Sequence, residues 1–275
     1  MAAGFPNARR AFGGSYSQAR EDWALFEQFS SYWNSSSHRG VFLEMGALDG
    51  WTHSNSLAYE RWLNWTGVLI EANPDSCVEL FERRRSGATV NLCTAISNGS
   101  SVAFERSGLR EVFAAKDQMS AEYRKRWRRT SGKEVVVPGQ PLGRLLRMVG
   151  LTHIDAFFLD VEGSELQVLR TFDWTLPVHV FCIETQPQTS EPTRALLLEH
   201  GYVKVPWRYA DQIRHKKRRQ LLLQSELFVR REPWPTEERS FLWAPEPQWT
   251  PPANWARQRA GRARRQGQRW PPGVE

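Results

Sequence analysis

Two carboxylates follow apolar runs in the second half of the chain. Asp160 ends the run 154–160, and Glu184 ends the run 178–184. Short runs rich in Val, Ile and Phe are typical of buried strands, and open α/β sheets carry their sites at the carboxyl ends of strands. A carboxylate there can act as a general base, orient a hydroxyl or an ammonium, or bind a cation. Asp160 and Glu184 are therefore candidate catalytic residues.

A glycine-containing turn follows an earlier apolar run. Residues 44–50 read Glu-Met-Gly-Ala-Leu-Asp-Gly, and glycines at such a strand end let the backbone approach a nucleotide-like cofactor. The turn lacks the GxGxxG dinucleotide pattern and the GKS or GKT ending of a phosphate loop. Glu71 ends the next apolar run, where an acid accepts hydrogen bonds from ribose hydroxyls. His53 follows the turn and is a further candidate base, unless it packs near a helix start.

Cysteines and carboxylates give little support for a metal site. The three cysteines, Cys77, Cys93 and Cys182, form no CxxC pair, so neither a zinc knuckle nor a thioredoxin-like motif is available. Cys93 and Cys182 lie in apolar runs and are expected to be buried thiols. Asp160 and Glu184 alone are weak evidence for a magnesium site, and no metal is predicted.

Expected strands and helices alternate along the segments that carry these residues. Apolar residues recur at helical spacing in several of the intervening segments, and this alternation favours a mostly parallel sheet covered on both faces. A charged loop without a crossover helix joins the last two strands, so we expect an antiparallel hairpin at the edge. The expected strands are 41–45, 67–71, 89–94, 154–160, 178–184, 202–206 and 224–230, and the expected helices are 54–63, 74–84 and 164–172.

The length of 275 residues and an apolar fraction of 40% fit one large domain with tails. Residues 1–14 are small and polar and are expected to be loose, and the domain is expected to span 15–232. Within it, 100–141 is longer than an ordinary connection and reads as an insert or lid with a basic helix at 120–129. The Pro-, Trp- and Arg-rich tail, 233–275, is expected to be disordered.

Several segments in order resemble the FkbM-type methyltransferase family. They are Ser17-Gln18 with Glu21-Asp22, then residues 42–50, 54–56, 65–74, 91–97, 154–155 and 159–165. The resemblance covers about residues 15 to 230. It implies a class I methyltransferase fold, which is a Rossmann-like, seven-stranded, mostly parallel sheet with an antiparallel last strand and helices on both faces.

The resemblance also implies a cofactor, S-adenosylmethionine, and roles for individual residues. The turn from Glu44 through Gly46, Ala47, Asp49 and Gly50 would hold the methionine part of the cofactor. Glu71 would bind the ribose, Ala95 and Ile96 would flank the adenine, and Gln18 would close over the cofactor. Asp160 would lie beside the transferred methyl and the acceptor. The implied activity is O-methyl transfer to a hydroxyl of a small molecule or glycan.

Two other functions remain open. A related eukaryotic branch resembles the insect Star protein, which acts in endomembrane trafficking, so a catalytically silent module is one alternative. The other is nucleic-acid binding or modification through the basic runs 124–129 and 214–219, which otherwise form a solvated helix face and a charged loop. The chain carries 37 Lys and Arg against 30 Asp and Glu, but none of the excess falls on the expected cofactor segments.

The compartment follows from what the sequence lacks. No run approaches the roughly 18–20 apolar residues of a membrane helix, and residues 1–20 contain no secretory signal, although a short transit peptide is an alternative. A soluble cytoplasmic protein is therefore expected, with organelle or endomembrane association as the alternative. Glycosylation-like triplets begin at Asn34, Asn64 and Asn98 and matter only on the secretory route. The acceptor and the oligomeric state cannot be read from the sequence.

Overall fold

The computed structural model describes residues 6–33, 39–84, 86–106, 113–116, 134–185, 190–209 and 225–231. The expected basic helix at 120–129, the basic run 214–219 and the tail 233–275 lie outside these ranges.

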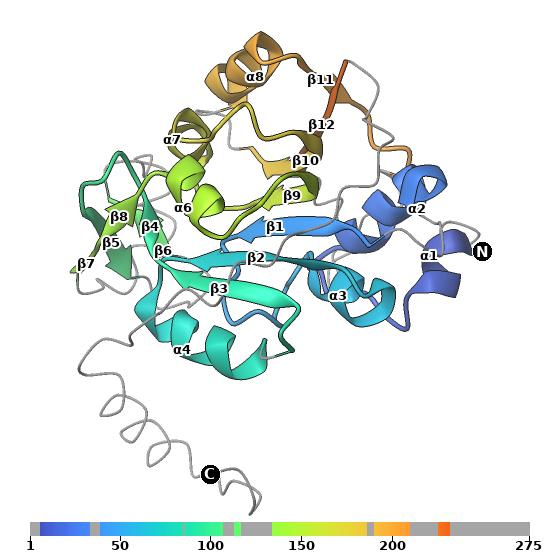
Figure 1. Cartoon of the computed structure of the whole chain (residues 1–275), viewed down its shortest axis with the longest axis horizontal. Helices are drawn as coiled ribbons and strands as arrows, with labels where there is room; N and C mark the ends of the chain where they lie inside the picture. The colour runs from blue at the N-terminus through green and yellow to red at the C-terminus, as the bar shows by residue number, and fades with distance from the viewer. Residues whose placement is uncertain are drawn as a thin grey trace, which may run out of the picture. The chain divides into compact units, whose positions relative to one another are not determined.

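A seven-stranded sheet forms the centre of the described domain (Figure 1), with strand order β11-β12-β10-β9-β1-β2-β3. Its strands are β1 (Val41–Met45), β2 (Thr66–Glu71), β3 (Thr89–Cys93), β9 (Ile154–Leu159), β10 (Val178–Glu184), β11 (Tyr202–Val205) and β12 (Ser225–Arg230). β12 pairs antiparallel with both neighbours, whereas the other pairs are parallel. The expected fold class is thus confirmed. The reversed strand lies one place in from the edge, because β12 inserts between β10 and β11.

Helices cover both faces of this sheet, so its central strands are apolar throughout rather than alternating. On one face, Phe42 and Phe158 pack with residues of α1 (Pro6–Ala11), α2 (Glu21–Trp33), α3 (Leu57–Leu63) and α4 (Pro74–Arg83). On the other, Leu43 and Phe157 pack with residues of α6 (Leu142–Met148), α7 (Glu165–Arg170) and α8 (Ser190–Glu199). Every residue of β1 and β9 is buried as a result.

Within the segment that the sequence predicts to be loose, residues 6–11 form the helix α1, which packs on α2. Glu27 on α2 accepts hydrogen bonds from the backbone amides of Asn7 and Ala8, each at 2.9 Å, which satisfies donors that a helix start leaves unpaired. The ring of Phe12 packs 4.8 Å from that of Phe26. These contacts come from α2, so the composition of residues 1–14 alone did not predict them.

The expected insert contributes small sheets in its described part. β5 (Val102–Arg106) pairs antiparallel with β6 (Phe113–Ala115) and with β7 (Glu134–Val137). Just before the insert, β4 (Ala95–Ile96) pairs in parallel with β8 (Gly139–Gln140). The rings of Phe104 and Phe113 stack at 4.5 Å inside this unit. The described insert is therefore an elaborated β element beside β3.

Cys77 and Cys93 form a disulfide between α4 and the end of β3, with Cα atoms 5.9 Å apart. The expectation that Cys93 is a free buried thiol was wrong, because the packing of α4 against β3 places Cys77 next to it. Cys182 is free and buried, as expected.

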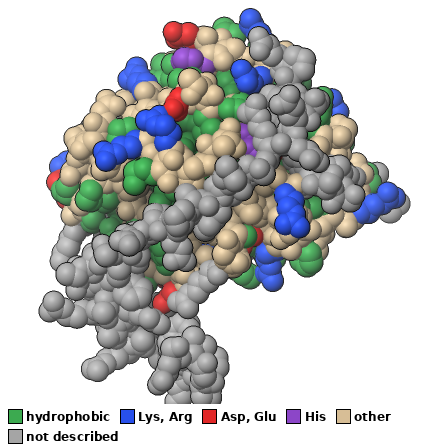
Figure 2. All heavy atoms as spheres, in the orientation of Figure 1, with side chains coloured by type: hydrophobic (Ala, Val, Ile, Leu, Met, Phe, Trp, Pro, Cys, Tyr) green, Lys and Arg blue, Asp and Glu red, His purple; other side chains and the backbone are tan. Residues whose placement is uncertain are grey.

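The surface and the helix lengths bear on two of the alternatives. On the face shown in Figure 2, the Lys and Arg side chains of described residues are dispersed and do not gather into one basic patch. Among the described residues, no helix is both long and apolar enough to cross a membrane.

Candidate active site

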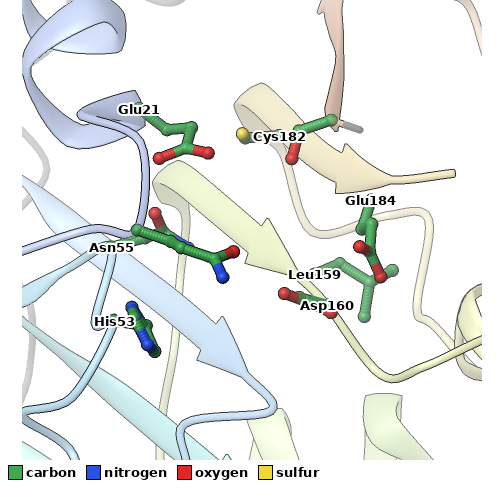
Figure 3. Close-up of a pocket in the computed structure, with 9 residues that line it drawn as sticks. Glu21, His53, Asn55, Leu159, Asp160, Cys182 and Glu184 are labelled. Atoms are coloured by element: carbon green, nitrogen blue, oxygen red, sulfur yellow. The ribbon is translucent and has the colours of Figure 1, made fainter. Parts of the chain in front are cut away.

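A pocket opens at the carboxyl ends of the central strands (Figure 3). The segment before α2, the loop after β1 and strands β9, β10 and β12 contribute its lining, which consists of Gln18, Glu21, His53, Asn55, Leu159, Asp160, Cys182, Glu184 and Ser225. The candidate residues Gln18, His53, Asp160 and Glu184 therefore meet at one place. Figure 3 shows His53 and Asn55 across the pocket from Asp160 and Glu184.

Asp160 and Glu184 are hydrogen-bonded to each other through their side chains. The pKa of Asp160 is raised, chiefly by burial, although its side chain is reached from the open pocket. The pKa of Glu184 is raised further, chiefly by the negative charge of Asp160 and then by burial. Like charges so close do not both ionise, so at neutral pH the pair holds one proton. The two carboxyl groups share that proton and titrate as a pair.

The glycine turn brings the end of β1 against the end of β9. Gly46 has φ +77°, and a Cβ at this position would lie 1.8 Å from the carbonyl oxygen of Asp160, so no other residue fits without moving backbone. Gly50 has φ +72°, and a Cβ there would meet Leu80 and Arg84 at 2.6 Å. The two glycines thus permit a close approach of backbone at the strand ends.

Glu44 belongs to the support of the pocket rather than to its lining. Its buried carboxylate accepts hydrogen bonds from the hydroxyls of Ser54 at 2.8 Å and Ser56 at 2.5 Å, and from the backbone amide of Asn55 at 2.7 Å. These bonds fix the loop that carries Asn55 into the pocket. The sequence placed Glu44 among the cofactor contacts, whereas the structure places its carboxylate under the loop.

Asp49 also stabilises the turn from within. It accepts hydrogen bonds from the amides of Trp51 at 2.9 Å and Thr52 at 2.7 Å, from the Thr52 hydroxyl, and from Arg83. Burial alone would raise the pKa of Asp49, but these hydrogen bonds and the charge of Arg83 outweigh it and lower the pKa. Asp49 is therefore a carboxylate that closes a tight turn.

Arg84 holds the loop between Gly50 and α3, a role that no pattern in the sequence predicts. Its Nε lies 2.6 Å from a carboxylate oxygen of Glu60, and its Nη1 lies 2.9 Å from the Gly50 carbonyl. Further bonds of 3.3 Å reach the hydroxyls of Ser54 and Ser56. The side chain of Arg84 is 1% exposed, against 40% for its neighbour Arg83. Nothing local distinguishes the two arginines.

Glu71 lies at the end of β2, on the other side of β1 from the pocket. Its two carboxylate oxygens accept the amides of Leu48 and Asn73, each at 2.7 Å, and burial raises its pKa to about 7. Each oxygen keeps a lone pair for another donor. The Thr94 amide donates to the Glu71 carbonyl at 3.0 Å, which brings Ala95 and Ile96 beside this strand end.

Several pocket residues were not selected from the sequence. Glu21 and Asn55 belong to segments that carry the family resemblance but have no predicted role of their own, Cys182 is predicted only to be a buried thiol, and Ser225 has no distinguishing pattern. Burial is the main reason that the pKa of Glu21 is raised. Arg20, His53 and Glu162 adopt positive φ, which is uncommon for these residues and often accompanies functional sites. Such backbone conformations cannot be read from residue types.

Glu165 stabilises the turn after β9. Its Oε1 accepts the amides of Val161 at 3.2 Å and Gly163 at 3.0 Å, and burial raises its pKa to about 7. In the described part of the chain, no group of three or more His, Cys, Asp or Glu is arranged to hold a metal ion.

Comparison with known proteins identifies the family of the chain. A precorrin-6y C5,15-methyltransferase from Geobacter metallireducens GS-15 is similar in structure at 11% identity and a TM-score of 0.39, over 74% of this chain and 84% of the other. The methyltransferase FkbM from Methylobacillus flagellatus KT is similar at 12% identity and a TM-score of 0.39, over 82% of this chain and 58% of the other. No match was found among curated proteins. Residues 44–204, more than half of the chain, match the family described as "Methyltransferase FkbM domain", and the chain therefore belongs to this methyltransferase family.

Proposed function

We propose that the chain transfers the methyl group of S-adenosylmethionine to a hydroxyl oxygen of a small molecule or glycan. The observation that carries the proposal is the position of β1 in the sheet. β1 lies between β2, which ends in Glu71, and β9, which is followed by Asp160. A ligand lying across the end of β1 can therefore reach the Glu71 carboxylate at one end and the acidic pocket at the other.

The residues on this edge fit the proposed cofactor. Glu71 offers lone pairs to the ribose hydroxyls, and Ala95 and Ile96 lie one strand further along, where the adenine would be held. Gly46 leaves no side chain at the end of β1, where the methionine part would lie. Ala47, Asp49 and Gly50 shape that turn, and Gln18 lines the pocket from the N-terminal segment and would cover the cofactor.

In this proposal Asp160 takes the proton of the acceptor hydroxyl. When bound, S-adenosylmethionine supplies a methyl group that is already activated on a sulfonium. Holding the acceptor oxygen in line contributes roughly 7–11 kcal/mol, and a positioned general base contributes about 10²- to 10⁴-fold. Glu184, which shares one proton with Asp160, orients it through the hydrogen bond between their side chains. His53, across the pocket, orients the acceptor or serves as the base in its place.

The test combines binding with turnover. Calorimetry with S-adenosylhomocysteine measures the cofactor site without an acceptor, and a screen of hydroxylated metabolites and sugars measures methyl transfer. We expect Asp160→Asn to retain binding and to lose about 10²- to 10⁴-fold in turnover. The matched control is Glu199→Gln, an exposed carboxylate on α8, which should change neither.

Two outcomes would contradict the proposal. Turnover of Asp160→Asn equal to that of the unsubstituted protein would remove Asp160 from the base role and leave His53. Failure to bind S-adenosylhomocysteine at millimolar concentration would favour the catalytically silent module.

A further inference from the structure

The disulfide between Cys77 and Cys93 bears on where the chain folds. Cys77 is 3% exposed and lies on α4, whereas Cys93 ends β3, opposite Glu71 in the strand register. The bridge therefore links two elements of the main core. Disulfides of this kind form and persist in oxidising compartments and are rare where cellular thiols are kept reduced. This observation points away from the reducing compartment expected from the sequence.

The triplet Asn64-Trp65-Thr66 presents its asparagine to solvent. Asn64 ends α3 in the left-handed conformation, with φ 57° and ψ 34°, and its backbone amide donates to the Tyr59 carbonyl. Trp65 is fully buried and anchors the turn, while Asn64 is exposed. An exposed asparagine in an Asn-x-Ser/Thr triplet at a turn is the pattern that accepts an N-linked glycan.

A second triplet, Asn98-Gly99-Ser100, lies in the turn between β4 and β5. All three residues are exposed, and Gly99 has φ +98°. The Ser97 hydroxyl stabilises the turn by donating to the Ser100 carbonyl at 2.5 Å and accepting from the Gly99 amide at 3.2 Å. The turn thus has its own support and leaves the Asn98 side chain at the surface.

Neither position lies in the pocket lining. Asn64 precedes β2, and Glu71 ends it, so the six residues of the strand separate Asn64 from the carboxyl edge by about 20 Å. Asn98 follows β4 and is not among the residues that line the pocket. Attached sugars would therefore leave the pocket lining free.

We propose that the chain passes through an oxidising compartment of the secretory route and carries N-linked glycans at Asn64 and Asn98. In the transfer step, the asparagine amide nitrogen forms a bond to the anomeric carbon of a lipid-linked oligosaccharide. The bond from that carbon to the lipid diphosphate breaks, the diphosphate leaves, and the nitrogen loses one proton. A protein disulfide of the same compartment takes the two electrons and two protons of the Cys77 and Cys93 thiols. The proposal does not depend on the methyl acceptor.

Mass spectrometry of the full chain isolated from its source cells tests both parts. Alkylation before and after reduction distinguishes free cysteines from disulfide-bonded ones. Peptide N-glycosidase in heavy-oxygen water marks each glycosylated asparagine. We expect Cys77 and Cys93 to be alkylated only after reduction, and Asn64 and Asn98 to carry the heavy label. Asn73, which is followed by proline and lies in no acceptor triplet, is the internal control. Free Cys77 and Cys93 thiols in the isolated chain would overturn the compartment, and an unlabelled asparagine would overturn glycosylation at that position.

Substitutions separate glycosylation from chemical deamidation. When the full chain is expressed in its source cells, Ser100→Ala should remove one glycosidase-sensitive mobility step, although Asn98 is still present. Ser100→Thr preserves the triplet and should retain the step. Asn64→Gln should remove the other step. Identical mobility of Ser100→Ala and Ser100→Thr would show that Asn98 carries no glycan.

Discussion

Replacing Arg84 by methionine would test how the turn at residues 46–50 is held in place. The guanidinium of Arg84 is almost completely buried and bonds Glu60, the Gly50 carbonyl and the hydroxyls of Ser54 and Ser56. Methionine fills part of the same space but offers none of these donors. Among the described residues, the carboxylate of Glu60, whose side chain is 7% exposed, would then keep the Ser86 hydroxyl, at 2.6 Å, as its hydrogen-bond partner.

The magnitude follows from burial. Removing one partner of a buried ion pair leaves an uncompensated charge, which destabilises a protein by about 3–5 kcal/mol. The neighbouring Arg83 is the matched control, because it also bonds a carboxylate, Asp49, but its own side chain is 40% exposed. Pairs involving an exposed partner contribute about 0–1 kcal/mol. We therefore expect Arg84→Met to lower the free energy of unfolding by about 3–5 kcal/mol and Arg83→Met by about 1 kcal/mol or less.

Urea denaturation followed by circular dichroism measures both variants under the same conditions. The double variant Arg84→Met with Glu60→Gln should be more stable than Arg84→Met alone, because the second change removes the unpaired charge. Binding of S-adenosylhomocysteine should weaken in Arg84→Met, since Gly50 and the loop to Ser56 lose their support. If Arg84→Met were no less stable than Arg83→Met, the assignment of Arg84 as the buried support of the turn would be wrong.

Three further changes test other parts of the same edge. Gly46→Ala should destabilise the protein by about 2–4 kcal/mol and abolish cofactor binding, whereas Gly87→Ala, at φ +72° with nothing within 4 Å, should lose only about 1–2 kcal/mol in the same denaturation assay. The pKa of Glu71 is about 7 in the folded state, against 4.5 for the ordinary group, so the folded state binds more protons than the unfolded state between these pH values. The free energy of unfolding should therefore fall as pH rises from about 4.5 to 7. A Glu71→Gln variant whose denaturation midpoint falls equally steeply with pH would contradict this. Reduction of the disulfide, which joins cysteines 16 residues apart, should lower the free energy of unfolding by about 3 kcal/mol, and Cys93→Ser should no longer respond to reductant.

Much of the fold could be predicted because a strand that is buried on both faces is a continuous apolar run in the sequence. The runs that became β1, β9 and β10 are apolar almost throughout, and the predicted bounds agree with the structure to within one residue. Asp160 and Glu184 were found for the same reason, since the first polar residues after such runs must lie at the carboxyl edge of a parallel sheet. The hairpin of β11 and β12 followed from the missing crossover helix.

Sequence alone did not determine which side chain faces which partner. Glu44 and Glu71 both end apolar runs, yet Glu44 turns under the loop at Ser54 and Ser56, whereas Glu71 remains at the strand end. Arg83 and Arg84 are adjacent and alike in type, but only Arg84 points into the core. These differences depend on contacts with residues far along the chain.

Local patterns of residue type were enough to predict the strands, the carboxylates at their ends and the family resemblance. Such patterns could not predict the Cys77–Cys93 bridge, the packing of α1 on α2 or the proton shared by Asp160 and Glu184. Each of these depends on a distance between distant segments, and that distance exists only once the helices have packed on both faces of the sheet.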